Sequence, residues 1–324
     1  MISPQPLSDL RPYPVEITPP DISAYRTGNT GVDYFISFSG PVTGPHAMVT
    51  ALMHGNELCG AVVLDELLRS GFRPARGRLS IGFCNVDAFL SFDVERPTLS
   101  RFLDEDMNRL WETEILAGGR NTREVQRCRK IQPLLDNVDM LLDIHSMQHP
   151  TAPLMLAGPL SKGRSLAESV GVPDTIVVDR GHAAGRRMRD YAHFSDPKQK
   201  AAALLVECGQ HWASSTVDIA RSTTIRFLVA TGVADPELID AWPGNDNTGA
   251  QHVIEVTHPI TVETNSFKFV ESYVGMEVIP KAGTLLGTDG DKPIHTPHDN
   301  CVLIMPSRRL RKGQTAVRLG RFLD

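Results

Sequence analysis

The stretch that most constrains this chain is Met53-His54-Gly55-Asn56-Glu57, which stands between a largely apolar run and an amphipathic segment. Residues 47–52 are apolar and β-rich, a pattern typical of a buried strand, while residues 58–68 space their apolar side chains as a helix does. The motif therefore falls at the carboxyl end of a strand, where open α/β sheets bind ligands, and Gly55 is expected to allow a sharp turn there. A histidine and a carboxylate in this position can converge on one metal ion, and the pair suits zinc.

A third candidate ligand follows a second buried strand. Residues 140–144 have the pattern of such a strand, and His145 comes directly after them. Together with His54 and Glu57 it provides two histidines and one glutamate, which with one open position is the ligand set of a catalytic zinc site. The alternative for the His54/Glu57 pair alone is a helix cap and a surface charge, because short motifs often arise by chance. The third ligand at a second strand end favours the metal site.

Two further stretches carry groups suited to catalysis. Glu207 follows the apolar residues 201–206, so we expect it at the same sheet edge, placed to take a proton from the attacking water; the alternative is a helix-capping glutamate. Arg101 and Arg109 lie in a loop, the latter directly after Asn108, and guanidinium groups bind carboxylates in a bidentate manner. Taken alone, this loop is better explained as a solvated loop with ordinary surface ion pairs.

Composition restricts the class of protein. A chain of 324 residues, 41% of them hydrophobic, can bury a large core and is long enough for two domains. The formal net charge of −5 argues against a nucleic-acid partner. No apolar run approaches the length of a membrane span and no signal pattern begins the chain, so we expect a cytoplasmic protein without a membrane partner. The five cysteines are scattered and never spaced C-x-x-C, which predicts buried reduced thiols.

The first three quarters of the chain alternate predicted strands with predicted helices. Such alternation indicates an α/β fold with a mostly parallel or mixed sheet flanked by helices. Residues 121–124 (Asn-Thr-Arg-Glu) have the form of a capping box and are expected to begin a helix that ends near Leu135. Strands are expected at residues 31–40, 47–52, 79–84, 140–144, 154–156, 175–178 and 201–206, and further helices at 58–68, 162–170 and 217–231.

The pattern changes near the C-terminus. Residues 243–249 are rich in turn-forming residues, and beyond them short alternating runs punctuated by glycine and proline predict an all-β segment. We therefore predict a catalytic domain over residues 1–245 and a C-terminal β domain over residues 246–324 that caps the active site.

The motifs described so far occur together, and in the same order, in one known family. The sequence resembles the succinylglutamate desuccinylase/aspartoacylase family, a branch of the zinc carboxypeptidase-like fold, over most of its length. The resemblance is carried by His54-Gly55-Asn56-Glu57, Asp106-Met107-Asn108-Arg109, Asp143-Ile144-His145 and Val206-Glu207-Cys208-Gly209, and by residues 281–286 and 296–299, which look like the family's β domain.

The resemblance implies a zinc-dependent deacylase that cleaves the amide bond of a small N-acyl amino acid. In that case His54, Glu57 and His145 bind one Zn²⁺ per chain, and Glu207 acts first as general base and then as general acid. Alternatives are a carboxypeptidase-like metallopeptidase and a non-catalytic binding module. A capping β domain favours small substrates over peptide chains, and the complete set of candidate ligands with the base argues against a module that has lost activity.

The resemblance also implies how the substrate is held. Asn108 and Arg109 would bind a carboxylate of the small-molecule substrate, and Arg101 would polarise the scissile carbonyl and stabilise the oxyanion. The sequence is compatible with a homo-oligomer.

One position departs from the family pattern. Ten residues before Glu207, relatives that act on acyl-aspartate or acyl-glutamate carry an arginine for a second carboxylate, and this chain has Pro197 there. We therefore expect one bound carboxylate and a preference for N-acylated neutral amino acids. The alternative anchors for a second carboxylate are Lys198, Lys200 and the cluster Arg186, Arg187 and Arg189.

Overall fold

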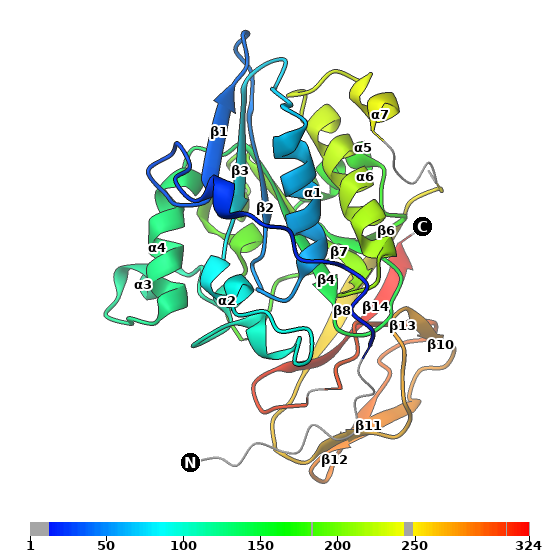
Figure 1. Cartoon of the computed structure of the whole chain (residues 1–324). Helices are drawn as coiled ribbons and strands as arrows, with labels where there is room; N and C mark the ends of the chain where they lie inside the picture. Colours follow the sequence, from blue (N-terminus) through cyan, green and yellow to red (C-terminus); the bar gives the residue numbers. More distant parts are fainter. Residues whose placement is uncertain (1–12, 183, 243–248, 309, 324) are drawn as a thin grey trace.

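The computed structural model describes residues 13–182, 184–242, 249–308 and 310–323, and a large mixed sheet forms its centre (Figure 1). The eleven strands of this sheet lie in the order β1-β3-β2-β4-β7-β5-β6-β8-β14-β13-β10, and a separate sheet has the order β12-β11-β9. The strands are β1 (Phe35–Ser39), β2 (His46–Ala51), β3 (Arg78–Phe83), β4 (Met140–Met147), β5 (Leu154–Leu156), β6 (Thr175–Val178), β7 (Ala202–Gln210), β8 (His252–Thr261), β9 (Phe267–Phe269), β10 (Glu277–Ile279), β11 (Leu285–Asp289), β12 (Lys292–His295), β13 (Cys301–Ile304) and β14 (Thr315–Leu323).

Helices cover both faces of the parallel part of the sheet. The α-helices are α1 (Leu58–Arg69), α2 (Val86–Leu90), α3 (Thr113–Ala117), α4 (Arg123–Leu135), α5 (Ser161–Val170), α6 (Ser215–Ala230) and α7 (Leu238–Ala241). The 3₁₀ turns are η1 (Ser23–Tyr25), η2 (Leu99–Arg101), η3 (Met107–Arg109), η4 (Met188–Asp190) and η5 (Ala192–Phe194). Helices α1, α5 and α6 pack together on one face and α4 lies on the other, which confirms the predicted fold class (Figure 1).

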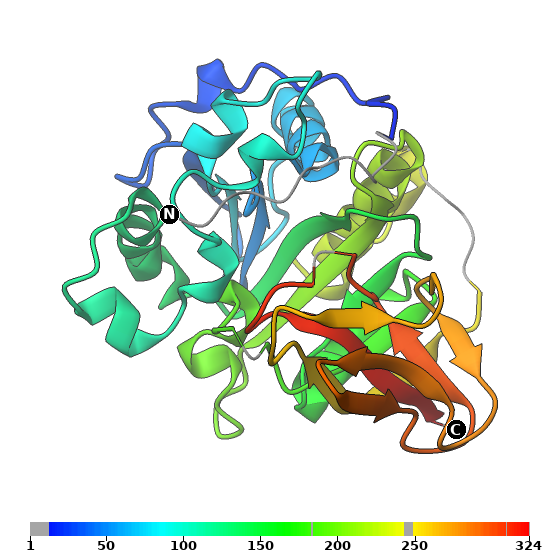
Figure 2. The same ribbon diagram turned by 90° about the horizontal axis from the view of Figure 1, so that it is seen from below.

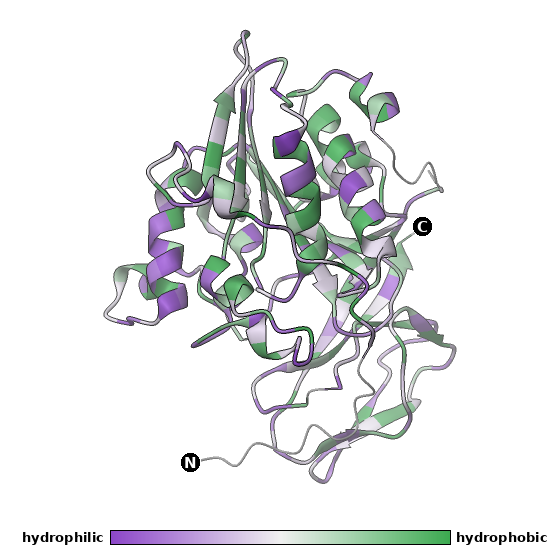
Figure 3. Ribbon diagram, in the orientation of Figure 1, coloured by the Kyte–Doolittle hydropathy of each residue, from purple (hydrophilic) through white to green (hydrophobic). Residues whose placement is uncertain are grey.

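The alternation of side chains along the strands explains the two helical layers. In β2, Val49 packs into the cluster that includes Leu64 of α1, whereas its neighbour Met48 packs into the cluster that includes Ile131 of α4. Strands buried on both faces read as continuous apolar runs, which is the pattern that residues 47–52 show. The helices keep hydrophilic residues on their outer sides, most visibly along α4 (Figure 3).

The C-terminal residues are all-β, as expected, but most of their strands extend the main sheet. Strand β8 pairs in parallel with β6, and β14, β13 and β10 follow it in antiparallel order. Only β9, β11 and β12 form the separate antiparallel sheet. Figure 2 shows these strands gathered on one side of the molecule. The predicted boundary at 245/246 and most of the predicted linker lie outside the described residues, so the division into two domains stays a prediction.

Some local expectations need correction. The N-cap of α4 is Thr122, whose hydroxyl accepts from the Val125 amide, and Glu124 does not close a capping box. Helix α2 and the turn η2 lie within residues 85–106, where no helix was predicted. All five cysteines are buried and free, as expected. Among the described residues, no helix is both long and apolar enough to span a bilayer.

Candidate active site

The turn between β2 and α1 is shaped by close packing. Residues 55–56 form the expected turn, but the left-handed φ in this stretch belongs to Leu52, at +59°. Gly55 is needed for space, because a Cβ there would lie 2.4 Å from the backbone of α2 and 2.5 Å from the carbonyl oxygen of Ser100. The sharp turn was therefore predicted correctly. The reason given, the conformational freedom of glycine, was wrong, because the turn requires the absence of a side chain at Gly55.

This turn and β4 bring the three expected ligands together. Nδ1 of His54 lies 2.7 Å from Oε1 of Glu57, and Nδ1 of His145 lies 2.9 Å from its Oε2. All three residues are buried, and one potential ligand atom from each lies within 4.8 Å of the others. Burial opposes ionisation of Glu57, but the two histidines hold its pKa well below the usual range.

Two aspartates orient the histidines from behind. Nε2 of His145 lies 2.8 Å from Asp143, and Nε2 of His54 lies 2.9 Å from Asp106. Thr50 donates to the other oxygen of Asp143 at 2.8 Å. Such contacts set which ring nitrogen faces a metal. Both aspartates stand in motifs that the sequence singles out, and the position of Asp143 two residues before His145, on the same face of one strand, was a usable signal for this role.

The pairing of β4 with β7 places Glu207 beside the ligands. His145 is aligned with Glu207 across these parallel strands. The sequence predicted that each residue follows its strand, but both residues lie inside their strands. Glu207 is 7% exposed, and its Oε2 has no hydrogen-bond partner in the described part of the chain. Burial raises the pKa of Glu207 to about 8, so this carboxyl can hold or release a proton near neutral pH.

The loop before α3 presents Asn108 and Arg109. Asp106 accepts from the Asn108 amide and so caps η3. The Met188 amide donates to Oδ1 of Asn108 at 3.0 Å, which leaves the Nδ2 donors for the cavity. Arg109 donates to the Asn108 carbonyl at 2.6 Å and stays 3.9 Å from Asp106. Burial, together with neighbouring guanidinium groups, lowers the pKa of Arg109 to about 10.

Arg101 also reaches the site, although it is partly engaged there. Its guanidinium donates to Glu57 at 3.2 Å and to Asp106 at 3.4 Å. It also lies 2.9 Å from Nε2 of His54. Arg101 is therefore next to the ligands, as a group that acts on the reacting carbonyl must be.

The three candidate ligands line one cavity of about 530 Å³. Its lining also includes Arg101, Asp106, Asn108, Arg109 and Glu207. The opposite wall of the cavity comes from the β13–β14 region. This region was predicted to belong to the capping β domain, but no site residue was predicted in it. The lining residues from this region are Met305, Pro306, Ser307, Arg311, Gln314, Thr315 and Arg318.

Comparison with known proteins decides the family. The model of the succinylglutamate desuccinylase/aspartoacylase catalytic domain matches residues 43–228, more than half of the chain. The chain belongs to the succinylglutamate desuccinylase/aspartoacylase family. A curated relative, a succinylglutamate desuccinylase from Burkholderia cenocepacia, is 25% identical over 83% of this chain and 79% of its own length.

Solved structures show that the fold is shared with this family. A succinylglutamate desuccinylase from Vibrio cholerae superposes with a TM-score of 0.65 at 18% identity, covering 90% of this chain and 86% of the other. Murine aminoacylase 3 superposes with a TM-score of 0.57 at 17% identity, covering 86% and 95%. The resemblance and the fold class inferred from the sequence are thereby confirmed.

The expected position of the family's second-carboxylate anchor is not in the cavity. Pro197 lies exposed in the turn before β7 and does not line the cavity, and Lys198 and Lys200 are exposed in the same turn. Counting back from Glu207 therefore does not identify the anchor, and the expected preference for neutral amino acids loses its basis.

The arginine cluster does not supply a free anchor in the cavity either: Arg186 is exposed and does not line the cavity, and the other two arginines already have partners. Arg187 donates to both oxygens of Asp179 and also pairs with Asp190. Arg189 pairs with Asp190 and donates to the Ala203 carbonyl. Both arginines are buried structural groups.

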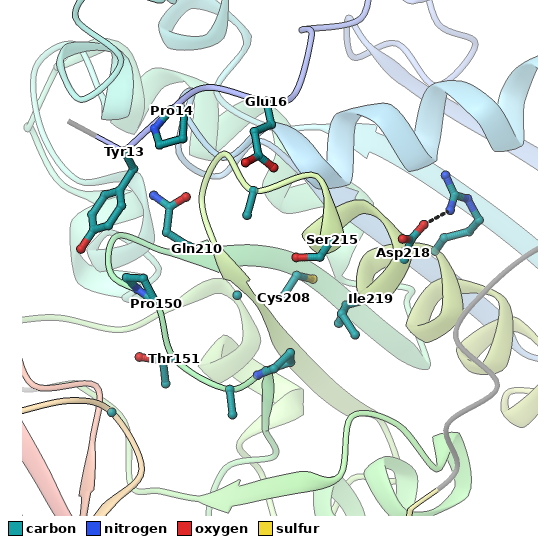
Figure 4. A pocket seen from close by; sticks show the side chains of 16 residues that line it. Tyr13, Pro14, Glu16, Pro150, Thr151, Cys208, Gln210, Ser215, Asp218 and Ile219 are labelled. Atoms are coloured by element: carbon teal, nitrogen blue, oxygen red, sulfur yellow. Dashed lines mark hydrogen bonds and ion pairs between the residues drawn. The ribbon is translucent and has the colours of Figure 1, made fainter. Parts of the chain in front are cut away.

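A second, wider hollow lies on the other side of β7 (Figure 4). Side chains alternate along this strand, so Cys208 faces the hollow while Glu207 faces the catalytic cavity. The charged groups around it already have partners: Asp218 pairs with Arg221, and Glu16 accepts from Ser214. The hollow is about 1120 Å³ in volume, and the described residues that line it bring no set of unsatisfied polar groups together, so it is not the candidate active site.

Proposed function

We propose that this chain is a zinc-dependent hydrolase that cleaves the amide bond of a small N-acyl amino acid. Membership of a family of deacylases supports the reaction class. The observation that carries the proposal is the position of Glu207, which lines the same cavity as His145 and the other candidate ligands and whose Oε2 has no hydrogen-bond partner among the described residues.

The donor set fits zinc. Two imidazole nitrogens and a carboxylate, each histidine held from behind by an aspartate, are the groups that a catalytic zinc site uses. We assign His54, Glu57 and His145 as its ligands. A bound zinc ion supplies a Lewis acid that polarises carbonyl groups and makes water more acidic.

The chain's own residues then divide the remaining tasks. Glu207, with its raised pKa, accepts a proton from the attacking water and later delivers it to the leaving amine. Asn108 and Arg109 hold a substrate carboxylate with the donors that the protein leaves unused. We assign to Arg101 the stabilisation of the charge that develops on the carbonyl oxygen, because its guanidinium lies beside Glu57.

The size of the cavity favours a small substrate over a peptide. About 530 Å³ lies within the range of small-molecule pockets, and the lining residues of the β13–β14 region close one side of the cavity. A peptidase on the same site remains the rival that the test must address. Five free thiols support a reducing compartment such as the cytoplasm.

Two measurements test the proposal. Elemental analysis of the purified protein is expected to find about one zinc ion per chain. The zinc-loaded protein is then assayed on N-acyl amino acids and on short peptides of matched side chains. Release of amino acids from the acyl compounds supports the proposal, turnover of peptides alone supports the peptidase, and full zinc occupancy without any turnover contradicts both.

A further inference from the structure

A buried arginine of the C-terminal strands faces the catalytic cavity. Arg318 lies in β14, where it is aligned with Pro259 of β8 and Ile304 of β13. Its neighbours Val317 and Leu319 pack into a hydrophobic cluster, and side chains alternate along a strand. Arg318 therefore points the other way, lines the cavity, and is only 7% exposed.

The charge of Arg318 is poorly compensated by the protein. Within the described ranges, its one ion pair joins Nε to Oδ2 of Asp179 at 3.6 Å, longer than a hydrogen bond. Asp179 is already bound by Arg187 through two hydrogen bonds of 2.8 and 2.9 Å. The charge of Glu207 acts on Arg318 through space, but Oε2 of Glu207 has no hydrogen-bond partner in the part of the chain that the structure describes. A buried guanidinium with unused donors is costly unless a ligand supplies the missing acceptor.

The other arginines of the cavity show which donors are available. Arg187 is saturated by two aspartates, and Arg101 is engaged with Glu57 and Asp106. Arg311 also lines the cavity, but it is exposed to solvent. Among the other cavity arginines, Arg109 and Arg318 are the two whose guanidinium groups have no carboxylate within 3.5 Å in the described part of the chain. Burial lowers the pKa of both arginines, and the positive charge of Arg318 adds to the effect on Arg109. A ligand with one negative charge near each guanidinium group would compensate for these two buried positive charges.

We propose that Arg318 determines substrate specificity by binding a second carboxylate, distinct from the one held by Asn108 and Arg109. The planar guanidinium group matches a carboxylate in a bidentate manner. The inference rests on the proposed function and names its substrate class: N-acyl compounds that carry two carboxylates. The C-terminal strands, rather than the segment around Pro197, supply the recognising group.

The test compares substrates that differ only in this charge. N-acetylaspartate is paired with N-acetylasparagine, and N-succinylalanine with N-butyrylalanine, so that the second carboxylate is placed either in the amino acid or in the acyl group. The Arg318→Met variant keeps an apolar stem and removes the guanidinium group, while Asp179 keeps its bonds to Arg187. For the pair that the wild type discriminates more strongly, we expect the charged-to-neutral ratio of kcat/KM to fall about 10- to 100-fold, mainly through KM.

Two further variants separate binding from general damage. Arg318→Lys keeps the charge without the planar group, so its ratio is expected between those of wild type and Arg318→Met. Arg321→Met changes an exposed arginine of the same strand that pairs with Glu255, and is expected to leave the ratio unchanged. An unchanged ratio in Arg318→Met overturns the proposal. So does an equal fall in kcat for both substrates at constant KM, which would mean that Arg318 acts on Glu207 instead.

Direct binding distinguishes this inference from the proposed function. Calorimetry with N-acetylaspartate and N-succinylalanine requires no turnover. If the wild type hydrolyses none of the compounds but binds one of the dicarboxylates at least tenfold more tightly than Arg318→Met does, the hydrolase proposal fails and the role of Arg318 stands. Equal or absent binding in the two proteins overturns the role of Arg318 whatever the activity.

Discussion

Replacing Glu124 by glutamine tests whether one buried carboxylate holds the active-site loop. Glu124 is fully buried, and its Oε1 accepts from the Leu103 amide at 2.7 Å and from Asn85 at 3.3 Å. Its Oε2 accepts from the amides of Asp104 and Glu105 at 3.1 and 3.3 Å. The side-chain oxygen of a glutamine can keep the first two bonds. Its NH₂ group, which has donors only, would then face the backbone amides of Asp104 and Glu105, which are donors as well.

The expected loss follows from those two bonds. At about 1.5 kcal/mol for each hydrogen bond to a charged group, Glu124→Gln lowers the free energy of unfolding by about 3 kcal/mol. With a urea m-value of about 3 kcal/mol/M, the unfolding midpoint falls by about 1 M. Because the loop continues into Asp106, which orients His54, metal affinity is expected to fall about tenfold as well.

A matched variant controls for the loss of a glutamate from a helix. Glu168 lies on α5 and pairs with Arg164 at an exposed position, so Glu168→Gln is expected to cost well under about 1 kcal/mol. Urea unfolding followed by circular dichroism gives both values. A midpoint for Glu124→Gln within about 0.2 M of the control would refute the reasoning, since it would mean that the loop does not depend on this carboxylate.

Three other predictions follow from the site and its surroundings. His145→Ala is expected to lose the metal while circular dichroism stays native, and full metal occupancy would remove it from the ligand set. Glu207→Gln is expected to keep the metal and lose turnover by about two to four orders of magnitude; near-normal activity would mean that another group moves the proton. Burial opposes ionisation of Asp190, but Arg187 and Arg189 lower its pKa to about 2, so its stabilising effect is present above pH 4 or so and is lost as the pH falls toward 2. The difference in unfolding free energy between wild type and Asp190→Asn should therefore shrink over that window, and a constant difference would contradict the assignment.

Local pattern was sufficient for the elements and for most of the site. Parallel strands end at one edge of the sheet, so residues at the ends of β2, β4 and β7 had to come close together whatever the details of packing. That rule is enough to group His54, Glu57, His145 and Glu207. It does not say that His145 and Glu207 lie within their strands, because the ends of strands depend on the pairing partner.

Glu124 is a residue whose role the sequence pattern did not predict correctly. Its spacing from Asn121 fits a capping box, but Thr122 caps the helix instead. The carboxylate is used by the amides of a loop some twenty residues earlier in the chain. A local motif identifies which groups can bond nearby, and tertiary packing decides whether a competing partner is closer.

The sequence by itself determined the fold class, the family and the candidate ligands, because these depend on periodicity and on motifs only a few residues long. Only the tertiary structure showed which residues form the remaining wall of the cavity. Counting along the chain selected Pro197, but a turn that faces solvent has no fixed relation to Glu207 in space. Arg318 reaches the cavity from a strand more than a hundred residues later, through antiparallel pairing with β8 and β13. The register of such pairing is set by the packing of the whole sheet, and no short-range pattern contains it.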